Sequence, residues 1–337
     1  VVRVHGRNIG SAVSERNGKF HQHSFEVWEA INNMVDYEYR KAEFAAFGPW
    51  ILEITDQTPL PPLFIPYYKE DGIALMRIKI PRDIERRKAN QDMDLYDYII
   101  GLYEDHIYIL ERVDRNVKET VISYAEMEAL ENYVDILAGK FTIFLHDRKV
   151  IIPYNAVSGE IINSMMRIIR DRYTVKSYRR LASPYDCDSE KNLIKETRCR
   201  NLLDEMRADH ESFDVTVIQP SVMLRAMNGG IRQKVLQYLH SERLLGSLHL
   251  ASEREILVIN RGKPFKTRKD VISCHSHSHL YIPIEKLQSV LFEKDDCFDN
   301  LQKLSMKTNN YTFLFYFEDS NKESQDYYRN MIGLVIA

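Results

Sequence analysis

The fold is decided by the stretch IIGLYEDHIYILERV at 99–113 and the three segments that follow it. These are VISYAEMEALENY at 121–133, GKFTIFLHDRKVIIPYN at 139–155 and SGEIINSMMRIIRDRY at 158–173. The first three are rich in β-branched and aromatic residues between turn formers, which is typical of strands. In the last, the apolar spacing i, i+3, i+4, i+7, i+11 predicts an amphipathic helix whose buried stripe is Ile162, Met165, Met166, Ile169 and Tyr173.

A second stretch near the C-terminus repeats this plan. Its segments are LLGSLHLASEREILVINRG (244–262), LYIPIEKLQSVLFE (280–293), QKLSMKTNNYTFLFYFED (302–319) and SNKESQDYYRNMIGLV (320–335). The aligned apolar positions are Ile107–Leu110 with Ile256–Ile259, and Ile122, Tyr124, Met127 and Leu130 with Ile282, Ile284, Leu287 and Val290. The match breaks at an insertion that we place from Arg261 to His279. Ser320 and Glu323 predict a capping box at the start of the second helix.

Several antiparallel strands closed by one C-terminal helix resemble the pleckstrin-homology-like (PH-like) fold, in particular the bacterial PH-like and GRAM-type modules. The resemblance is carried by IYILERV, VISYAEMEAL, FTIFL and the 158–173 helix, and it covers about half of the chain. It implies an α+β fold class: two PH-like antiparallel β modules, each closed by a C-terminal helix, plus an N-terminal helix and a helical inter-module segment. It also implies a binding or scaffolding role, often at membranes.

The predicted domain organisation has four parts. Residues 1–23 are polar and form a flexible tail, and 24–173 hold the N-terminal helix and the first module. Residues 174–212 form a linker and helix, and 213–337 form the second module. The N-terminal helix is expected to run from Ser24 to about Ala46, where Gly48-Pro49 stops it. The proline-rich segment from Pro59 to Tyr67 is expected to pack on its own core; a ligand for a groove-binding domain is the alternative.

Composition favours an ordinary globular protein of the cytoplasm. The 337 residues are 44% hydrophobic and 28% charged, and the net charge of −3 argues against nucleic acid as a partner. Four cysteines are scattered without a C-x-x-C pair, which fits a reducing compartment. No signal peptide is visible, and no apolar run approaches the ~20 residues of a membrane-spanning helix. We therefore expect a cytoplasmic protein, with any membrane association being peripheral.

A cluster of cations lies in the insertion of the second module. Its members are Arg261, Lys263, Lys266, Arg268 and Lys269. Compact positive charge in an inter-strand loop can hold a phosphate, an anionic lipid surface or an acidic partner. PH-like modules that bind phosphoinositides use such a loop, so the resemblance supports anion or lipid binding here; solvated surface charge is the alternative.

The neighbouring sequence CHSHSH at 274–279 is the candidate metal site. If it forms a strand, His275, His277 and His279 share one face, because side chains alternate along a strand. Three imidazoles on one face can bind zinc or copper. However, neighbouring same-face positions are ~7 Å apart, so three in a row splay widely for one ion. The alternative is a polar loop or an edge strand with exposed histidines.

No enzyme motif is present, since G-x-G-x-x-G, G-x-x-x-x-G-K-[ST], G-x-S-x-G and the kinase signatures are all missing. The sequence therefore predicts a non-enzymatic adaptor or scaffold without a cofactor, which docks onto a protein assembly or an anionic membrane surface. A small-molecule substrate is not expected. The alternative function is a metal-dependent enzyme that uses the histidines at 275, 277 and 279.

Overall fold

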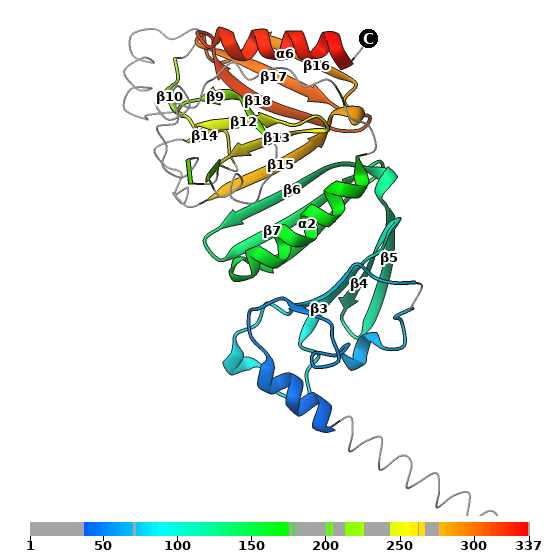
Figure 1. Cartoon of the computed structure of the whole chain (residues 1–337). Coiled ribbons are helices and arrows are strands. Elements are labelled where there is room, and N and C mark those ends of the chain that lie inside the picture. The colour runs from blue at the N-terminus through cyan, green and yellow to red at the C-terminus, as the bar shows by residue number, and fades with distance from the viewer. Residues whose placement is uncertain are drawn as a thin grey trace, which may run out of the picture.

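The chain has an α+β fold with antiparallel sheets and few helices (Figure 1). The structure is a computed structural model, and it describes residues 37–69, 72–174, 178, 200–201, 203–204, 213–225, 243–261, 263–266 and 276–335. The predicted tail at 1–23, and all of the predicted 174–212 linker except 174, 178, 200–201 and 203–204, lie outside these residues.

The first half is a run of strands that ends in a helix. Residues 37–46 are helical and end where the sequence predicts. One sheet has the order β1-β2-β3-β4-β5, and β6, β7 and β8 follow before the helix α2. Their bounds are β1 Leu52–Glu53, β2 Met76–Pro81, β3 Tyr96–Leu102, β4 His106–Val113, β5 Asn116–Ser123, β6 Met127–Asp135, β7 Ala138–Leu145, β8 Lys149–Asn155 and α2 Gly159–Tyr173. The 3-10 helices are η1 Pro62–Phe64, η2 Arg86–Lys88, η3 Tyr124–Glu126 and η4 Ala156–Ser158.

The second half repeats this element order. Its strands β9, β12, β13 and β15 are followed by η5, then by β16, β17 and β18, and then by α6. The bounds are β9 Asp214–Gln219, β12 Ser247–Ala251, β13 Glu255–Asn260, β15 His277–Pro283, η5 Ile284–Lys286, β16 Ser289–Lys294, β17 Leu301–Lys307, β18 Thr312–Glu318 and α6 Lys322–Val335. Three two-residue strands form a small separate sheet: β10 Val222–Met223, β11 Arg243–Leu244 and β14 Phe265–Lys266. The 3-10 helix η5 precedes β16 in the chain, as η3 precedes β6.

The two halves share one sheet. Strand β6 pairs with β15 from Leu130↔Tyr281 to Val134↔His277, and this joins three strands of the first half to four of the second (Figure 1). The resulting seven-stranded sheet has the order β8-β7-β6-β15-β13-β12-β9. A continuous hydrogen-bonded ladder therefore connects the two halves.

This sheet is the middle layer of the molecule. Successive residues of a strand point to opposite faces, and Leu257 belongs to a different buried cluster from its neighbours Ile256 and Val258. On one face the core includes residues of α2 and of the first sheet, and on the other it includes β16–β18 and α6. Each half contributes side chains to both cores, so burial of apolar area holds the halves together.

Several local predictions are confirmed by burial. All five residues of the predicted α2 stripe are buried. In the proline-rich segment Phe64 is buried, and the Tyr39 hydroxyl donates to the carbonyl of Leu60 at 2.8 Å, so this segment packs on its own core. None of the described helices is long and apolar enough to cross a membrane.

Three local predictions are wrong. The insertion does not extend to His279, because β15 begins at His277. The alternative of an edge strand with exposed histidines also fails, since β15 pairs with β13 on one side and β6 on the other. The N-cap of α6 is Asn321 rather than Ser320: the Asn321 side chain accepts from the backbone N–H of Ser324 at 3.3 Å, and a cap must directly precede the first helical residue.

Candidate docking site at the junction of the halves

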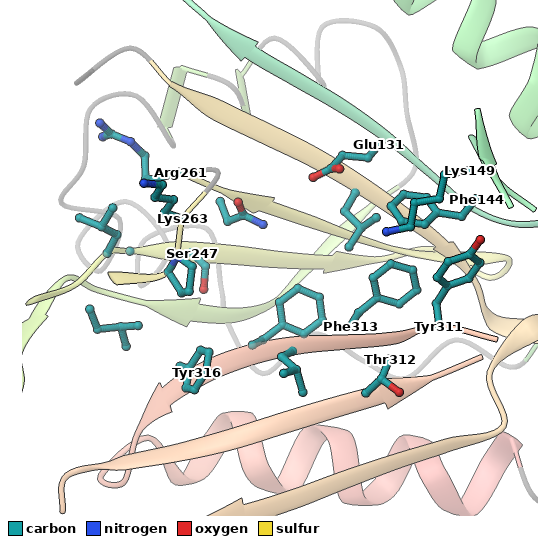
Figure 2. A pocket seen from close by; sticks show the side chains of 18 residues that line it. Glu131, Phe144, Lys149, Ser247, Arg261, Lys263, Tyr311, Thr312, Phe313 and Tyr316 are labelled. Carbon is teal, nitrogen blue, oxygen red and sulfur yellow. The ribbon is translucent and has the colours of Figure 1, made fainter. Parts of the chain in front are cut away.

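A pocket of about 360 Å³ lies where the first half meets the second (Figure 2). Strands β6, β7 and the start of β8 contribute Glu131, Phe144 and Lys149. The second half contributes the rest of the wall, which is Leu244, Leu245, Gly246, Ser247, Asn260, Arg261, Lys263, Pro264, Leu280 and 311–316. The pocket therefore depends on the pairing of β6 with β15.

One wall of the pocket is the free edge of a strand. Strand β18 is the last strand of the β16-β17-β18 sheet, and six consecutive residues, 311–316, line the pocket. Side chains alternate between the two faces of a strand, so consecutive residues all line a space only when it runs along the strand's edge. The pocket is thus a groove beside β18.

Three hydrogen bonds show which backbone groups of β18 point away from β17, on the side of the groove. Thr308 N–H donates to the Tyr311 carbonyl, and Asp319 N–H donates to the Asn300 carbonyl, so the odd-numbered residues of β18 bond to β17. Glu318 N–H points the other way and donates to Gln219 Oε1 at 2.9 Å. The N–H and C=O groups of 312, 314 and 316 therefore point outward, and within the described part of the chain they have no backbone partner.

Cations stand at both ends of the groove. Figure 2 shows Lys149 beside Phe144 and Tyr311 at one end, with Arg261 and Lys263 towards the end where Tyr316 lies. The Lys149 Nζ lies 4.7 Å from the centroid of the Phe144 ring and 5.3 Å from that of Tyr311. Such cation–π contacts hold an ammonium group in place without neutralising its charge.

An acidic residue lies between the cations. Glu131 on β6 accepts a hydrogen bond from the Ser278 hydroxyl at 2.6 Å, across the seam between the two halves. The charge pattern along the groove is therefore positive, negative, positive.

The structure divides the predicted anion-binding residues. Arg261 and Lys263 line the groove. Lys266 is exposed on β14, opposite Arg243 of β11, and does not line it. Arg268 and Lys269 lie outside the described residues.

Two of the three predicted metal ligands, His277 and His279, lie on the opposite face of the sheet from the groove. His277 and His279 share one face of β15 with ring centroids 5.4 Å apart, whereas Leu280 faces the groove. His275 lies outside the described residues. Where the structure describes the chain, no three His, Cys, Asp or Glu side chains gather as a metal ion requires.

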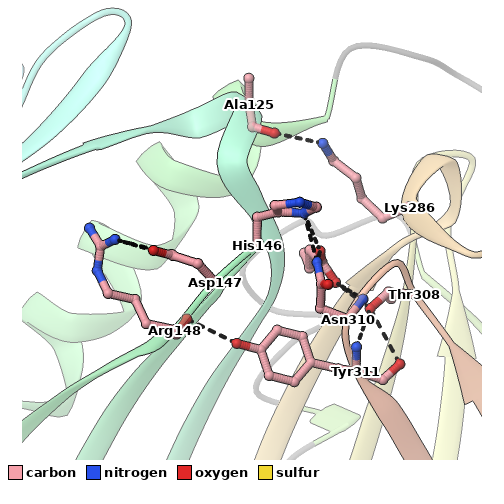
Figure 3. A network of polar contacts seen from close by, with 9 residues as sticks. Ala125, His146, Asp147, Arg148, Lys286, Thr308, Asn310 and Tyr311 are labelled. Atoms are coloured by element: carbon pink, nitrogen blue, oxygen red, sulfur yellow. Dashed lines mark hydrogen bonds and ion pairs between the residues drawn. The ribbon is translucent and has the colours of Figure 1, made fainter.

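A polar cluster beside the groove also joins the halves (Figure 3). The buried Glu128 of β6 accepts from the backbone N–H of Asn310 at 3.1 Å, from its side-chain amide at 2.7 Å and from the Thr308 hydroxyl. His146 Nδ1 lies 3.3 Å from Glu128 Oε1. Burial alone raises the pKa of Glu128, but these hydrogen bonds outweigh it, so the pKa is lowered and the carboxylate is ionised.

Two further bonds, one from the residue before β18 and one from η5, join the second half to the first. Tyr311 donates its hydroxyl to the Arg148 carbonyl at 2.9 Å, and the Lys286 ammonium donates to the Ala125 carbonyl at 2.8 Å. Both acceptors are backbone groups of the first half (Figure 3). The Tyr311 end of β18, and with it the groove, is therefore fixed relative to β7 and β8.

On the other face of the sheet, α2 is bonded to the second half. Arg170 donates from Nε to Glu255 Oε1 at 2.9 Å, and the Tyr173 hydroxyl donates to Glu255 Oε2 at 2.5 Å. The Arg170 guanidinium also lies 4.1 Å from the centroid of the Tyr281 ring. These side chains are buried or nearly so, and burial beside the Glu255 carboxylate raises the pKa of Tyr173 well above its ordinary value.

The sequence did not point to β18 or to Lys149 as part of a site. YTFLFY at 311–316 has the aromatic content of any strand, and nothing in it distinguishes an edge strand from a central one. Lys149 is the first residue of β8 in the other half, 112 positions before Arg261, so the pairing of β6 with β15 is what brings them to one groove.

No protein-family model matches the chain, and no curated protein sequence matches it.

Proposed function

We propose that this protein is a non-enzymatic adaptor or scaffold built from two PH-like modules fused through a shared sheet, and that the groove beside β18 is its docking surface. The order of elements supports the PH-like interpretation, because strands, a 3-10 turn, further strands and a closing helix occur twice. Fusion through β6 and β15 gives a stiff body with a fixed groove, which suits a part that positions others.

The observation that carries the proposal is the coincidence, in one groove, of an open strand edge with cations from both halves. Lys149 comes from the first half, and Arg261 and Lys263 come from the second. A free strand edge is a hazard that proteins normally block or cover. The combination of these cations with three edge residues of β18 that have no backbone partner among the described residues fits a surface that binds.

Docking onto a protein assembly is favoured over docking onto a membrane. The outward N–H and C=O groups of β18 alternate as donors and acceptors, and this pattern matches another polypeptide backbone rather than a layer of headgroups. Exposed apolar side chains also lie along the edge, with Leu314 47% exposed. For the metal-dependent enzyme, nothing in the described part of the chain adds support.

A comparison of groove variants tests this function. Three tagged proteins are used to capture partners from native lysate of the source cells: wild type, the double variant Lys149→Glu with Lys263→Glu, and the control Lys322→Glu. In parallel, sedimentation measures the binding of each protein to vesicles of phosphatidylcholine alone or mixed with phosphatidylserine. Lys322 is an exposed cation on α6 that does not line the groove, so it matches the change in charge.

We expect a protein that wild type and Lys322→Glu both retain and that the double variant loses. Retention of the same proteins by all three would remove the groove from the docking surface. Binding to anionic vesicles alone would replace the protein assembly with a membrane.

A further inference from the structure

We infer that the groove binds an extended acidic segment of a partner protein, which adds to the sheet as a new strand along the free edge of β18. This inference rests on the proposed docking function and names the chemistry of the partner. It follows from the backbone groups, the length and the charges of the groove.

The backbone groups define the mode of binding. Thr312, Leu314 and Tyr316 present N–H and C=O groups outward, while Phe313 and Phe315 bond to β17. An added strand would satisfy the outward groups in the alternating pattern of a β ladder. At the far end of the strand, the same outward position at Glu318 is already closed by Gln219, which sets one limit of the free edge.

The length of the free edge sets the size of the segment. Residues 312–316 span about 14 Å at ~3.4 Å per residue. A partner segment of about five residues would cover this edge, and its ends would lie near the two groups of cations (Figure 2).

The charges define the sequence of the segment. Lys149 at one end and Lys263 at the other favour carboxylates or phosphates near both ends of the bound segment. The acidic side chain of Glu131, which accepts a hydrogen bond from Ser278, disfavours an acid at the centre. The segment is therefore acidic at its ends and neutral in the middle, with β-branched residues suited to an extended backbone.

Proline placed on the free edge tests the ladder without breaking the fold. In Leu314→Pro an outward N–H is removed, and the bonds of β18 to β17 are kept, because 314 does not donate to β17. The matched control is Val121→Pro. Val121 is 53% exposed on β5, the last strand of the first sheet. The Val113↔Asn116 pair closes a two-residue hairpin, so Asn116 and the other even-numbered residues of β5 form hydrogen bonds with β4. Val121 is odd-numbered, and its N–H therefore points outward, away from β4.

The experiment is a selection of phage-displayed random linear peptides on the full-length protein. Selected peptides are then synthesised with a fluorescein label and titrated with each variant by fluorescence polarisation. We expect enrichment of Asp and Glu near both ends of a neutral, β-branched centre. Leu314→Pro should weaken binding about tenfold or more, as should Lys149→Glu with Lys263→Glu, while Val121→Pro binds like wild type. Thermal unfolding confirms that both proline variants are folded.

Two competitors separate the possible sources of negative charge. If inorganic phosphate or phosphatidylserine vesicles displace the labelled peptide as well as unlabelled peptide does, the site recognises anions and the strand addition is wrong. Selected peptides without acidic ends, or peptides that bind Leu314→Pro as tightly as wild type, would also overturn it. If lysate partners still depend on Lys149 and Lys263, the proposed docking function stands although this inference fails.

Discussion

Replacing Arg170 by Met should destabilise the whole protein, because the change leaves a buried carboxylate without its cation. Arg170 and Glu255 are 10% and 7% exposed, and Arg170 donates to Glu255 from both Nε and Nη2. In Arg170→Met the Tyr173 hydroxyl is the one donor to that carboxylate that remains among the described residues. Removing one partner of a buried pair costs about 3–5 kcal/mol, and the Met side chain keeps part of the packing against Tyr281.

The double variant Arg170→Met with Glu255→Met separates the charge from the packing. A buried ion pair replaced by apolar side chains is often close to neutral in stability. The Tyr173 hydroxyl would lose its acceptor, which costs about 1–3 kcal/mol. We therefore expect the double variant to be more stable than Arg170→Met alone.

Urea unfolding followed by circular dichroism measures these differences. Arg329→Met is the control, because its ion pair with Asp326 is 62% and 70% exposed and such pairs contribute about 0–1 kcal/mol. If Arg170→Met lowers the unfolding free energy no more than this control does, the Arg170–Glu255 pair does not hold α2 to the second half. A double variant that is less stable than the single one would contradict the cost assigned to the unpaired carboxylate.

Three further outcomes follow from individual side chains. Glu128→Gln should lower the free energy of unfolding by about 2–3 kcal/mol at neutral pH. Because the pKa of Glu128 is lowered in the folded state, its contribution is present above the ordinary pKa and is lost as the pH falls through the lowered pKa. In urea titrations at acid pH, the unfolding free energy of the variant should therefore depend less on pH than that of wild type. Burial lowers the pKa of His249 to about 3, so wild-type stability should fall as the pH drops from ~6.5 towards ~3, by up to about 1.4 kcal/mol per pH unit; an unchanged slope in His249→Asn would contradict this. Ile136 has a φ of 56° in the two-residue turn between β6 and β7, so Ile136→Gly should raise the unfolding free energy by about 1 kcal/mol, and a loss of stability would show that the turn is not strained.

Much of the local structure is predictable because it depends on short-range patterns. The apolar spacing in 158–173 predicted the buried stripe of α2, since a helix brings positions three and four apart to one side. The alignment of Tyr124 with Ile284 matches the structure at one point, since η3 begins at Tyr124 and η5 begins at Ile284. These features need no knowledge of distant neighbours.

The pairing of β6 with β15 was not predictable in the same way. The repeat in the sequence does not align Leu130 with Tyr281, although the structure pairs them. Each of the two strands also has the composition of any partly buried strand. Which strands meet is decided by the packing of two cores around one sheet. For the same reason, the sequence could not show that the groove combines Lys149 with Arg261 and Lys263 of the predicted basic cluster.

Backbone amide hydrogen exchange along β18, measured by NMR, tests the central claim most directly. In the free protein, the amides of Thr312, Leu314 and Tyr316 should exchange rapidly, while those of Phe313 and Phe315 are protected by β17. Adding a selected acidic peptide should protect the three outward amides and leave the other two as they were. Outward amides that stay unprotected in the peptide complex, or that are already protected in the free protein, would contradict an open edge that receives a strand.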